Sequence, residues 1–146
     1  EETQVVSWLL DADVLSQPVK THGNRALIAW LESEQNDCYT STIVIAQVAY
    51  WIRTKDGRAR DRLQQWLTRS IEAMEGRILA FNLATAHVWA DQKSLLEEAG
   101  KPMPIEDSYI AATARRHGLL IVTGNDKDFR RPGLKVFNPF KEAPSD

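Results

Sequence analysis

Short apolar runs alternate with amphipathic stretches along most of the chain. Residues 5–10 are apolar and partly β-branched, and the run stops at Asp11, which predicts a buried strand. Further strands are predicted at 38–40, 78–81, 119–123 and 135–138, and helices at about 23–34, 43–53, 59–74, 83–99 and 104–117. Buried strands that alternate with helices are typical of a parallel α/β sheet. Residues 1–4 and 141–146 are expected to be loose ends.

Local signals mark several helix boundaries. Ser41 and Thr42 are suited to cap the helix that follows them. Gly100 and Gly118 each follow a helix, as expected of a residue that ends a helix in the left-handed conformation. The apolar positions of the helix at 43–53 recur at helical spacing and predict its core-facing stripe, with Gln47 among them: Ile43, Ala46, Tyr50 and Trp51.

The composition is that of an ordinary folded protein. The 146 residues are 43% hydrophobic and 26% charged, which argues against disorder and predicts one domain over 1–146 with its core at about 5–140. A single cysteine, Cys38, excludes an internal disulfide and fits a reducing, cytoplasmic setting. No apolar run is long enough to span a bilayer, and no signal-peptide pattern is visible. Because the net charge is −2, a nucleic-acid role must rest on a local basic patch or on metal ions.

Acidic residues follow two of the predicted strands, at the sheet edge where open α/β sheets bind ligands. Asp11 follows the first strand, and the run from Thr123 to Asp128 follows the strand at 119–123. Asp107 lies in the first turn of a helix, on that helix's apolar face, so we expect it to point at the rim of the sheet. Three carboxylates can therefore converge on one crevice. Turn formation and helix capping are the simpler explanation for these residues, and the one expected for Asp126.

Converging carboxylates repel one another unless they are protonated or a cation neutralises them. Mg²⁺ binds oxygen ligands, takes few of them from protein and keeps waters for substrate phosphates. The spacing therefore indicates a Mg²⁺- or Mn²⁺-dependent phosphodiesterase or phosphatase. A haloacid-dehalogenase-like phosphatase also begins with Asp-x-Asp after a strand, but only 23 residues follow Thr123, too few for that family's later motifs.

Several runs of residues resemble PIN-domain nucleases, and especially the FitB-like branch of the VapC-type toxins. The resemblance covers about residues 5 to 140. The matching runs are WLLDADVLS at 8–16, DSYIAATA at 107–114, HGL at 117–119, VTGNDKDF at 122–129 and VFNPF at 136–140. It implies a three-layer α/β/α sandwich around a mainly parallel sheet, with RNA cleaved at a Mg²⁺- or Mn²⁺-binding cluster of acids.

Position by position, the resemblance assigns roles to five residues. Asp11 and Asp107 are metal ligands, and Asp128 is the last acid of the cluster. Asn125 is the polar companion of Asp128, and Thr123 contributes a hydroxyl beside the site. The resemblance also implies a VapB-type antitoxin partner, an RNA substrate such as tRNA, and a homodimer that can join antitoxins in a larger assembly.

One position departs from the family pattern. The second acid of the family, usually Glu, falls at Gln47, whose amide can offer an oxygen to a metal or water but cannot act as a general base. Three explanations stand: the charge was removed deliberately, the change is natural and the remaining acids suffice, or the protein is a catalytically weak relative. In the last case, a degenerate PIN domain would act only as a binding module.

Basic residues near the proposed site in sequence are candidates for contact with RNA phosphates. Arg115 and Arg130 are the two that we assign to substrate binding. Solvated helix surface explains such residues equally well.

Overall fold

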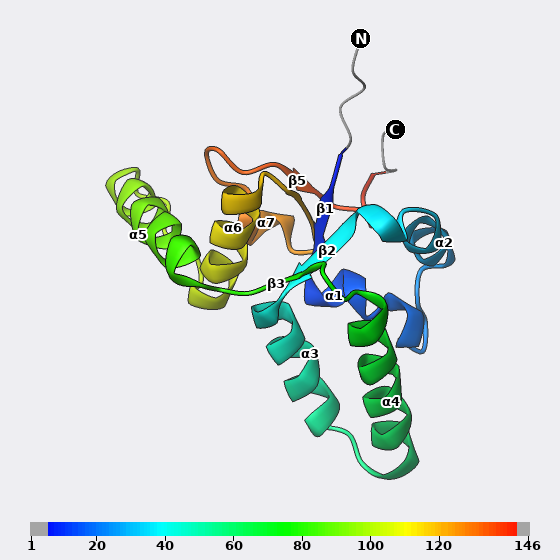
Figure 1. Ribbon diagram of the computed structural model, residues 1–146. Coiled ribbons are helices and arrows are strands. Elements are labelled where there is room, and N and C mark those ends of the chain that lie inside the picture. The colour runs from blue at the N-terminus through cyan, green and yellow to red at the C-terminus, as the bar shows by residue number, and fades with distance from the viewer. Residues whose placement is uncertain (1–5, 143–146) are drawn as a thin grey trace.

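The computed structural model describes residues 6–142, built around a five-stranded sheet with helices on both sides (Figure 1). The strands are β1 (Trp8–Leu10), β2 (Cys38–Ser41), β3 (Ile78–Leu79), β4 (Leu120–Val122) and β5 (Val136–Phe137). The sheet order is β3-β2-β1-β4-β5, and every neighbouring pair is parallel. The expected α/β/α class is confirmed.

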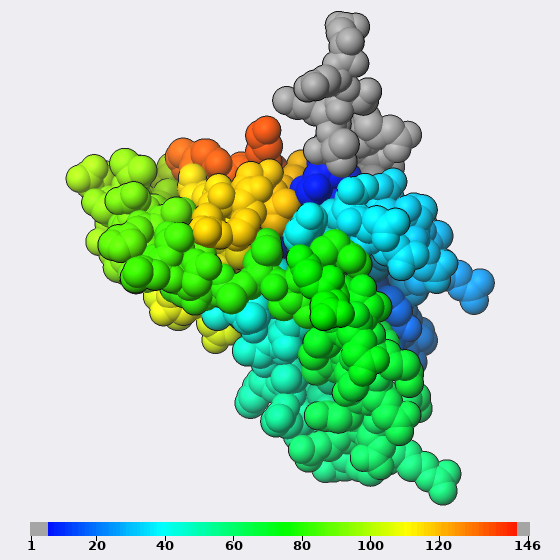
Figure 2. All heavy atoms as spheres, in the orientation of Figure 1, coloured from blue at the N-terminus to red at the C-terminus, as the bar shows by residue number. Residues whose placement is uncertain are grey.

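The five long helices expected from the sequence are all present. The helices are α1 (Ala12–Leu15), α2 (Arg25–Ser33), α3 (Thr42–Arg53), α4 (Gly57–Ala73), α5 (Leu83–Glu98), α6 (Ile105–His117) and α7 (Asp126–Phe129), with 3-10 helices η1 (Gln17–Val19) and η2 (Gln35–Asp37). The sequence did not predict α1, α7, η1 or η2, because three or four residues are too few to show a helical period. In Figure 1, α3 and α4 extend together from the sheet, and they form the lower lobe in Figure 2.

The strand order creates a switch point between β1 and β4. The chain builds β2 and β3 on one side of β1 and later returns to add β4 and β5 on the other side. The pairing of β1 with β4 continues just beyond the strand, where the Asp11 amide donates to the Val122 carbonyl at 3.0 Å. Asp11 and Thr123 therefore leave the sheet side by side, at the place where ligands of such sheets bind.

The predicted helix boundaries at Ser41 and the two glycines are confirmed. The Ser41 hydroxyl accepts a hydrogen bond from the Val44 amide at 3.1 Å, which satisfies one of the unpaired amide donors at the start of α3. Gly118 ends α6 at φ 65°, and Gly100 follows α5 at φ 69°. Both angles lie in the left-handed region, which a residue without Cβ adopts at little cost.

The core-facing side of α3 is not the predicted one. Val44, Val48 and Ile52 face the core and are at most 2% exposed, whereas Tyr50 is 71% exposed and Ala46 is also exposed. The prediction was wrong because α3 is apolar on nearly every side, so its pattern allowed two different stripes. Packing against neighbouring elements, foremost α4, selected the β-branched one.

The C-terminal segment is better ordered than the sequence suggested. The amides of Lys141 and Glu142 both donate to the Asn138 carbonyl, at 3.2 and 3.1 Å, so the expectation of a loose end from residue 141 was wrong for these two. Residues 1–5 and 143–146 lie outside the described residues, and with them the predicted start of the first strand. Within 6–142, no helix combines the length and apolar character needed to cross a bilayer.

Candidate active site

Asp11 is held at the end of β1 by two hydrogen bonds. The Thr123 hydroxyl donates to Oδ2 at 2.7 Å, and the Ala12 amide donates to Oδ1 at 2.9 Å. The side chain is only 7% exposed. Burial raises the pKa of Asp11, and the two hydrogen bonds offset only part of that effect. The carboxylate is thus fixed in place and is costly to keep charged without a cation.

Asp13 is a second carboxylate at this edge, to which the sequence assigned no role. The short helix α1 turns the chain back, so that Asp13 Oδ2 accepts the Gly124 amide at 2.8 Å. Its Oδ1 is buried and has no hydrogen-bond partner within 6–142. Burial, and next the negative charge of Asp11, raise the pKa of Asp13 to about 6. The Asp-x-Asp spacing was the available signal for it.

Asn125 connects two further acids. Its Nδ2 donates to Asp128 Oδ2 at 3.1 Å and to Asp107 Oδ2 at 3.4 Å, so α6 and α7 meet through one amide. Burial raises the pKa of Asp107 to about 6, and the negative charges of Asp11, Asp128 and Glu106 add to the effect. We call Asp11, Asp13, Asp107 and Asp128 the acidic cluster.

Gln47 lies beside this cluster and contacts an acid that the sequence did not single out. Its Nε2, on α3, donates to Glu106 Oε1, on α6, at 2.9 Å. Glu106 directly precedes Asp107, and both Gln47 and Glu106 line a hollow of about 620 Å³ between the two helices. Only the packing of α3 on α6 brings these residues together, since 59 positions separate them in sequence.

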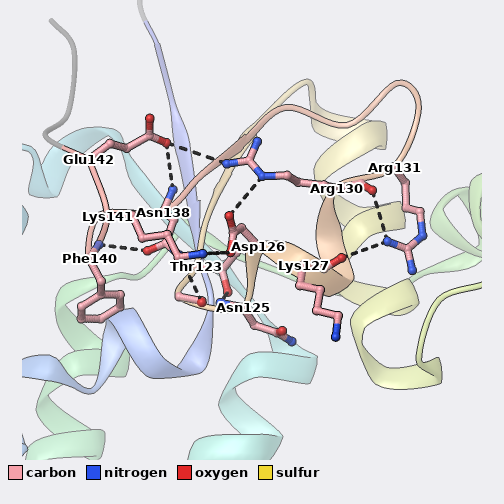
Figure 3. Close-up of polar contacts among 11 residues, drawn as sticks. Thr123, Asn125, Asp126, Lys127, Arg130, Arg131, Asn138, Phe140, Lys141 and Glu142 are labelled. Carbon is pink, nitrogen blue, oxygen red and sulfur yellow. Dashed lines mark hydrogen bonds and ion pairs between the residues drawn. The ribbon is translucent and has the colours of Figure 1, made fainter.

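Asp126 faces away from the cluster, consistent with the structural role expected of it. Figure 3 shows its carboxylate among groups of the C-terminal segment, while Asn125 extends to the opposite side. Asn138 Nδ2 donates to Oδ1 at 3.2 Å, Arg130 Nε donates to Oδ2 at 3.1 Å, and Lys141 Nζ lies 3.4 Å from Oδ1 (Figure 3). These hydrogen bonds lower the pKa of Asp126, with those from Asn138 and Arg130 the strongest. The network anchors the loop that carries Asn125.

The structure places the two arginines assigned to RNA in intramolecular contacts. Arg115 donates to Gln92 Oε1 at 2.7 Å and to the Pro132 carbonyl at 2.8 Å, and burial lowers its pKa. Arg130 is bound to Asp126. Neither set of contacts includes the acidic cluster, and their role in RNA binding stays a prediction.

Another arginine acts on the cluster directly. The positive charge of Arg131 lowers the pKa of Asp107 and so offsets part of the increase that burial and the neighbouring acids cause. Its guanidinium donates to the Lys101 and Pro102 carbonyls ahead of α6, at 3.1 and 2.9 Å. Arg131 therefore also ties the segment after α7 to the start of α6.

The ligand chemistry of the cluster suits a hard cation. Every side chain in it offers oxygen, the donor that Mg²⁺ prefers, and Asp13 Oδ1 is a buried acceptor without a donor within 6–142. Among these described residues, no three His, Cys, Asp or Glu side chains form a ready-made cage for an ion. Mg²⁺ does not require one, because it binds through one or two carboxylates and retains several waters.

Comparison with known proteins assigns the family. Residues 8–134 match the model of the PIN domain. The chain is 34% identical to Toxin FitB of Neisseria gonorrhoeae and 31% identical to VapC ribonuclease Y4jK of Sinorhizobium fredii, over 92% of this chain and 99% of each relative. A solved structure of FitAB bound to an IR36 DNA fragment matches with a TM-score of 0.86 and 31% identity, covering 95% of this chain and 99% of that chain. This protein belongs to the PIN-domain family.

Proposed function

We propose that this protein is a Mg²⁺- or Mn²⁺-dependent endoribonuclease, the toxin of a toxin–antitoxin pair. The observation that carries the proposal is the acidic cluster at the switch point of the sheet. Burial raises the pKa of Asp11 there, and burial together with neighbouring negative charges raises the pKa values of Asp13 and Asp107. The relatives' names, Toxin FitB and VapC ribonuclease, support both parts of the proposal.

Asp11 and Asp107 are the residues that we assign to the metal. A bound Mg²⁺ would lower the pKa of a coordinated water and offset the charge of the scissile phosphate. Thr123 keeps the Asp11 carboxylate oriented from one side, through the 2.7 Å hydrogen bond. Asn125 holds Asp107 and Asp128 at a fixed separation from the other side.

Asp128 is assigned to proton transfer. Its Oδ2 accepts only the Asn125 amide among the side-chain hydrogen bonds of the described chain, so the carboxylate keeps lone pairs free for a water. A carboxylate next to the metal site takes the proton from the attacking water as the water's oxygen bonds to phosphorus. The leaving ribose oxygen then departs and is protonated by solvent, which completes hydrolysis of the phosphodiester.

The partner we propose is a VapB-type antitoxin, with RNA as substrate and a homodimer as the assembly. Solved relatives at 31% and 33% identity are complexes named FitAB and FitAcB. The hollow between α3 and α6 adjoins the cluster, and its lining includes the exposed Tyr50. An antitoxin segment bound there would reach the acidic cluster and so prevent RNA from entering it.

A second candidate function is favoured by one observation. Gln47 stands where the family pattern expects an acid, so a degenerate PIN domain that only binds its antitoxin or RNA is the alternative. The interpretation as a haloacid-dehalogenase-like phosphatase is no longer supported, because the PIN-domain match spans 8–134.

The test is RNA cleavage by the protein purified free of antitoxin. We expect single-stranded RNA to be cut in the presence of Mg²⁺ and not in EDTA, with activity lost in Asp11→Asn. Asp91→Asn, a change at an exposed acid on α5, is the matched control and is expected to cleave as wild type does. A small phosphoester is expected to remain intact. Absence of cleavage by the folded, antitoxin-free wild type would favour the binding module.

A further inference from the structure

The contact between Gln47 and Glu106 joins two helices at the edge of the acidic cluster. The Gln47 amide donates to the Glu106 carboxylate at 2.9 Å, and both side chains face the same hollow. Among residues 6–142, no Lys or Arg forms an ion pair with Glu106. The amide of Gln47 is therefore the group that fixes the direction of this carboxylate.

The chemistry of the pair depends on residue 47 being neutral. A Glu at position 47 would place a second carboxylate within hydrogen-bonding distance of Glu106, where two negative charges disfavour each other. Gln has nearly the same shape and donates an N–H instead. The pair thus has one negative charge between the two helices, on Glu106 of α6 and not on residue 47 of α3.

Glu106 also lies at the edge of the cluster. It directly precedes Asp107 in the first turn of α6, and its carboxylate is held on the side of that helix that faces α3 by the contact with Gln47. A carboxylate at a helix N-terminus is favourable in itself, but that effect does not require the hydrogen bond that reaches across to α3.

We propose that Glu106, oriented by Gln47, is an additional acid of the site and takes the place that the family pattern gives to residue 47. The inference rests on the proposed metal-dependent function. It makes Gln47 a positioning residue, not the mark of a disabled enzyme. Glu106 then supports the metal directly or through a coordinated water.

The test measures Mn²⁺ affinity by electron paramagnetic resonance, on the full chain without antitoxin. We expect Glu106→Gln to raise the Kd for Mn²⁺ roughly tenfold, the low end of the loss seen when an outer ligand of a metal site is removed. The double variant Gln47→Glu with Glu106→Gln returns the charge to α3, and we expect it to recover wild-type affinity. Glu72→Gln removes an exposed charge on α4 and is expected to change nothing. Circular dichroism checks that each variant is folded.

Single replacement of Gln47 provides the opposing test. If Gln47→Glu tightens Mn²⁺ binding tenfold or more, the site lacked an acid at position 47 and the proposal is wrong. If Glu106 already fills that place, Gln47→Glu gives no gain. Wild-type affinity in Glu106→Gln, or a double variant as weak as Glu106→Gln alone, would also overturn the proposal.

The two proposals fail in different ways. If wild type binds Mn²⁺ and cleaves RNA, and Glu106→Gln does both equally well, the proposed function stands and the role of Glu106 is refuted. A folded wild type that neither binds Mn²⁺ nor cleaves RNA refutes both proposals. Loss of Mn²⁺ affinity in Glu106→Gln with recovery in the double variant supports the role of Glu106 even before any RNA target is known.

Discussion

Replacing Asp107 by Asn is expected to stabilise the metal-free protein while it abolishes metal-dependent activity. The cluster holds Asp107 where its charge is unfavourable, with a pKa of about 6 against an ordinary value of 3.8. Burial is the main cause, followed by the charges of Asp11 and Asp128. Asn keeps the shape of the side chain and can still accept the Asn125 amide through its oxygen. It carries no charge to be repelled.

The size of the effect follows from the pKa shift. A shift of roughly 2 units corresponds to about 3 kcal/mol at 1.36 kcal/mol per unit. Solvent around this half-buried side chain screens part of that energy, so about 1–2 kcal/mol is the expected gain. For a chain of this size such a gain raises Tm by about 2–8 °C.

The pH dependence has a defined sign. Because the folded state raises the pKa of Asp107, the folded protein binds this proton more tightly than the unfolded chain does. The contribution of Asp107 to stability therefore falls as pH rises from about 4 to above 6. The gain in Asp107→Asn is expected in full near pH 8 and is expected to shrink to a small remainder near pH 4, where the carboxyl is protonated in the folded protein and partly protonated in the unfolded chain.

The assay is thermal unfolding in EDTA at both pH values, for wild type, Asp107→Asn and the exposed control Asp91→Asn. A Tm for Asp107→Asn at or below that of wild type near pH 8 would refute the electrostatic argument. An equal gain at both pH values would refute it too, because the effect would then not depend on the charge. The control is expected to follow wild type throughout.

Three further substitutions test the packing around the cluster, each by urea unfolding in EDTA. Thr123→Val removes the hydroxyl that donates to Asp11 at 2.7 Å, and it is expected to lower the free energy of unfolding by about 1–3 kcal/mol near pH 8. The loss is expected to be smaller near pH 4, because a protonated Asp11 gains less from the donor than a charged one. An equal loss at both pH values would contradict this. Gly124→Ala would place a Cβ 2.5 Å from Asp13 Oδ2, so we expect a loss of about 1–3 kcal/mol in the free energy of unfolding and, in a separate measurement without EDTA, weaker Mn²⁺ binding; a variant that matches wild type in both would contradict this. Asn138→Ala removes a side chain that is 1% exposed and that donates to the Gly124 carbonyl, with an expected cost of about 2–3 kcal/mol, and a cost below about 0.5 kcal/mol would show that the loop is held elsewhere.

The alternation of strands and helices was predictable because it is a local property of the chain. Apolar runs of a few residues ending at Asp11 and near Thr123 predict β1 and β4, and both strands are present. Helix caps such as Ser41 are likewise read from neighbouring residues. The short helices α1 and α7 escaped prediction for the same reason, since neither is long enough to show a period.

The acids of the site were partly predictable from where they fall relative to the strands. Asp11 and Asp128 follow β1 and β4, and parallel strands bring their carboxyl ends to one edge. The contribution of Asp13 was missed because it depends on α1 turning the side chain back onto Gly124. The sequence did not show which groups bind Asp126, because they come from the C-terminal segment that folds around its carboxylate.

The sequence by itself determined the strands and the five long helices, and it placed Asp11, Asp107 and Asp128 at the edge of the sheet. The tertiary structure alone decided which face of α3 is buried and what Gln47 does. An apolar helix carries no local signal for choosing between two stripes, and packing against neighbouring elements, foremost α4, made that choice. Gln47 departs from the family pattern when it is considered alone. Its partner Glu106 lies on another helix, 59 positions away, and only the folded chain brings the amide and the carboxylate within hydrogen-bonding distance.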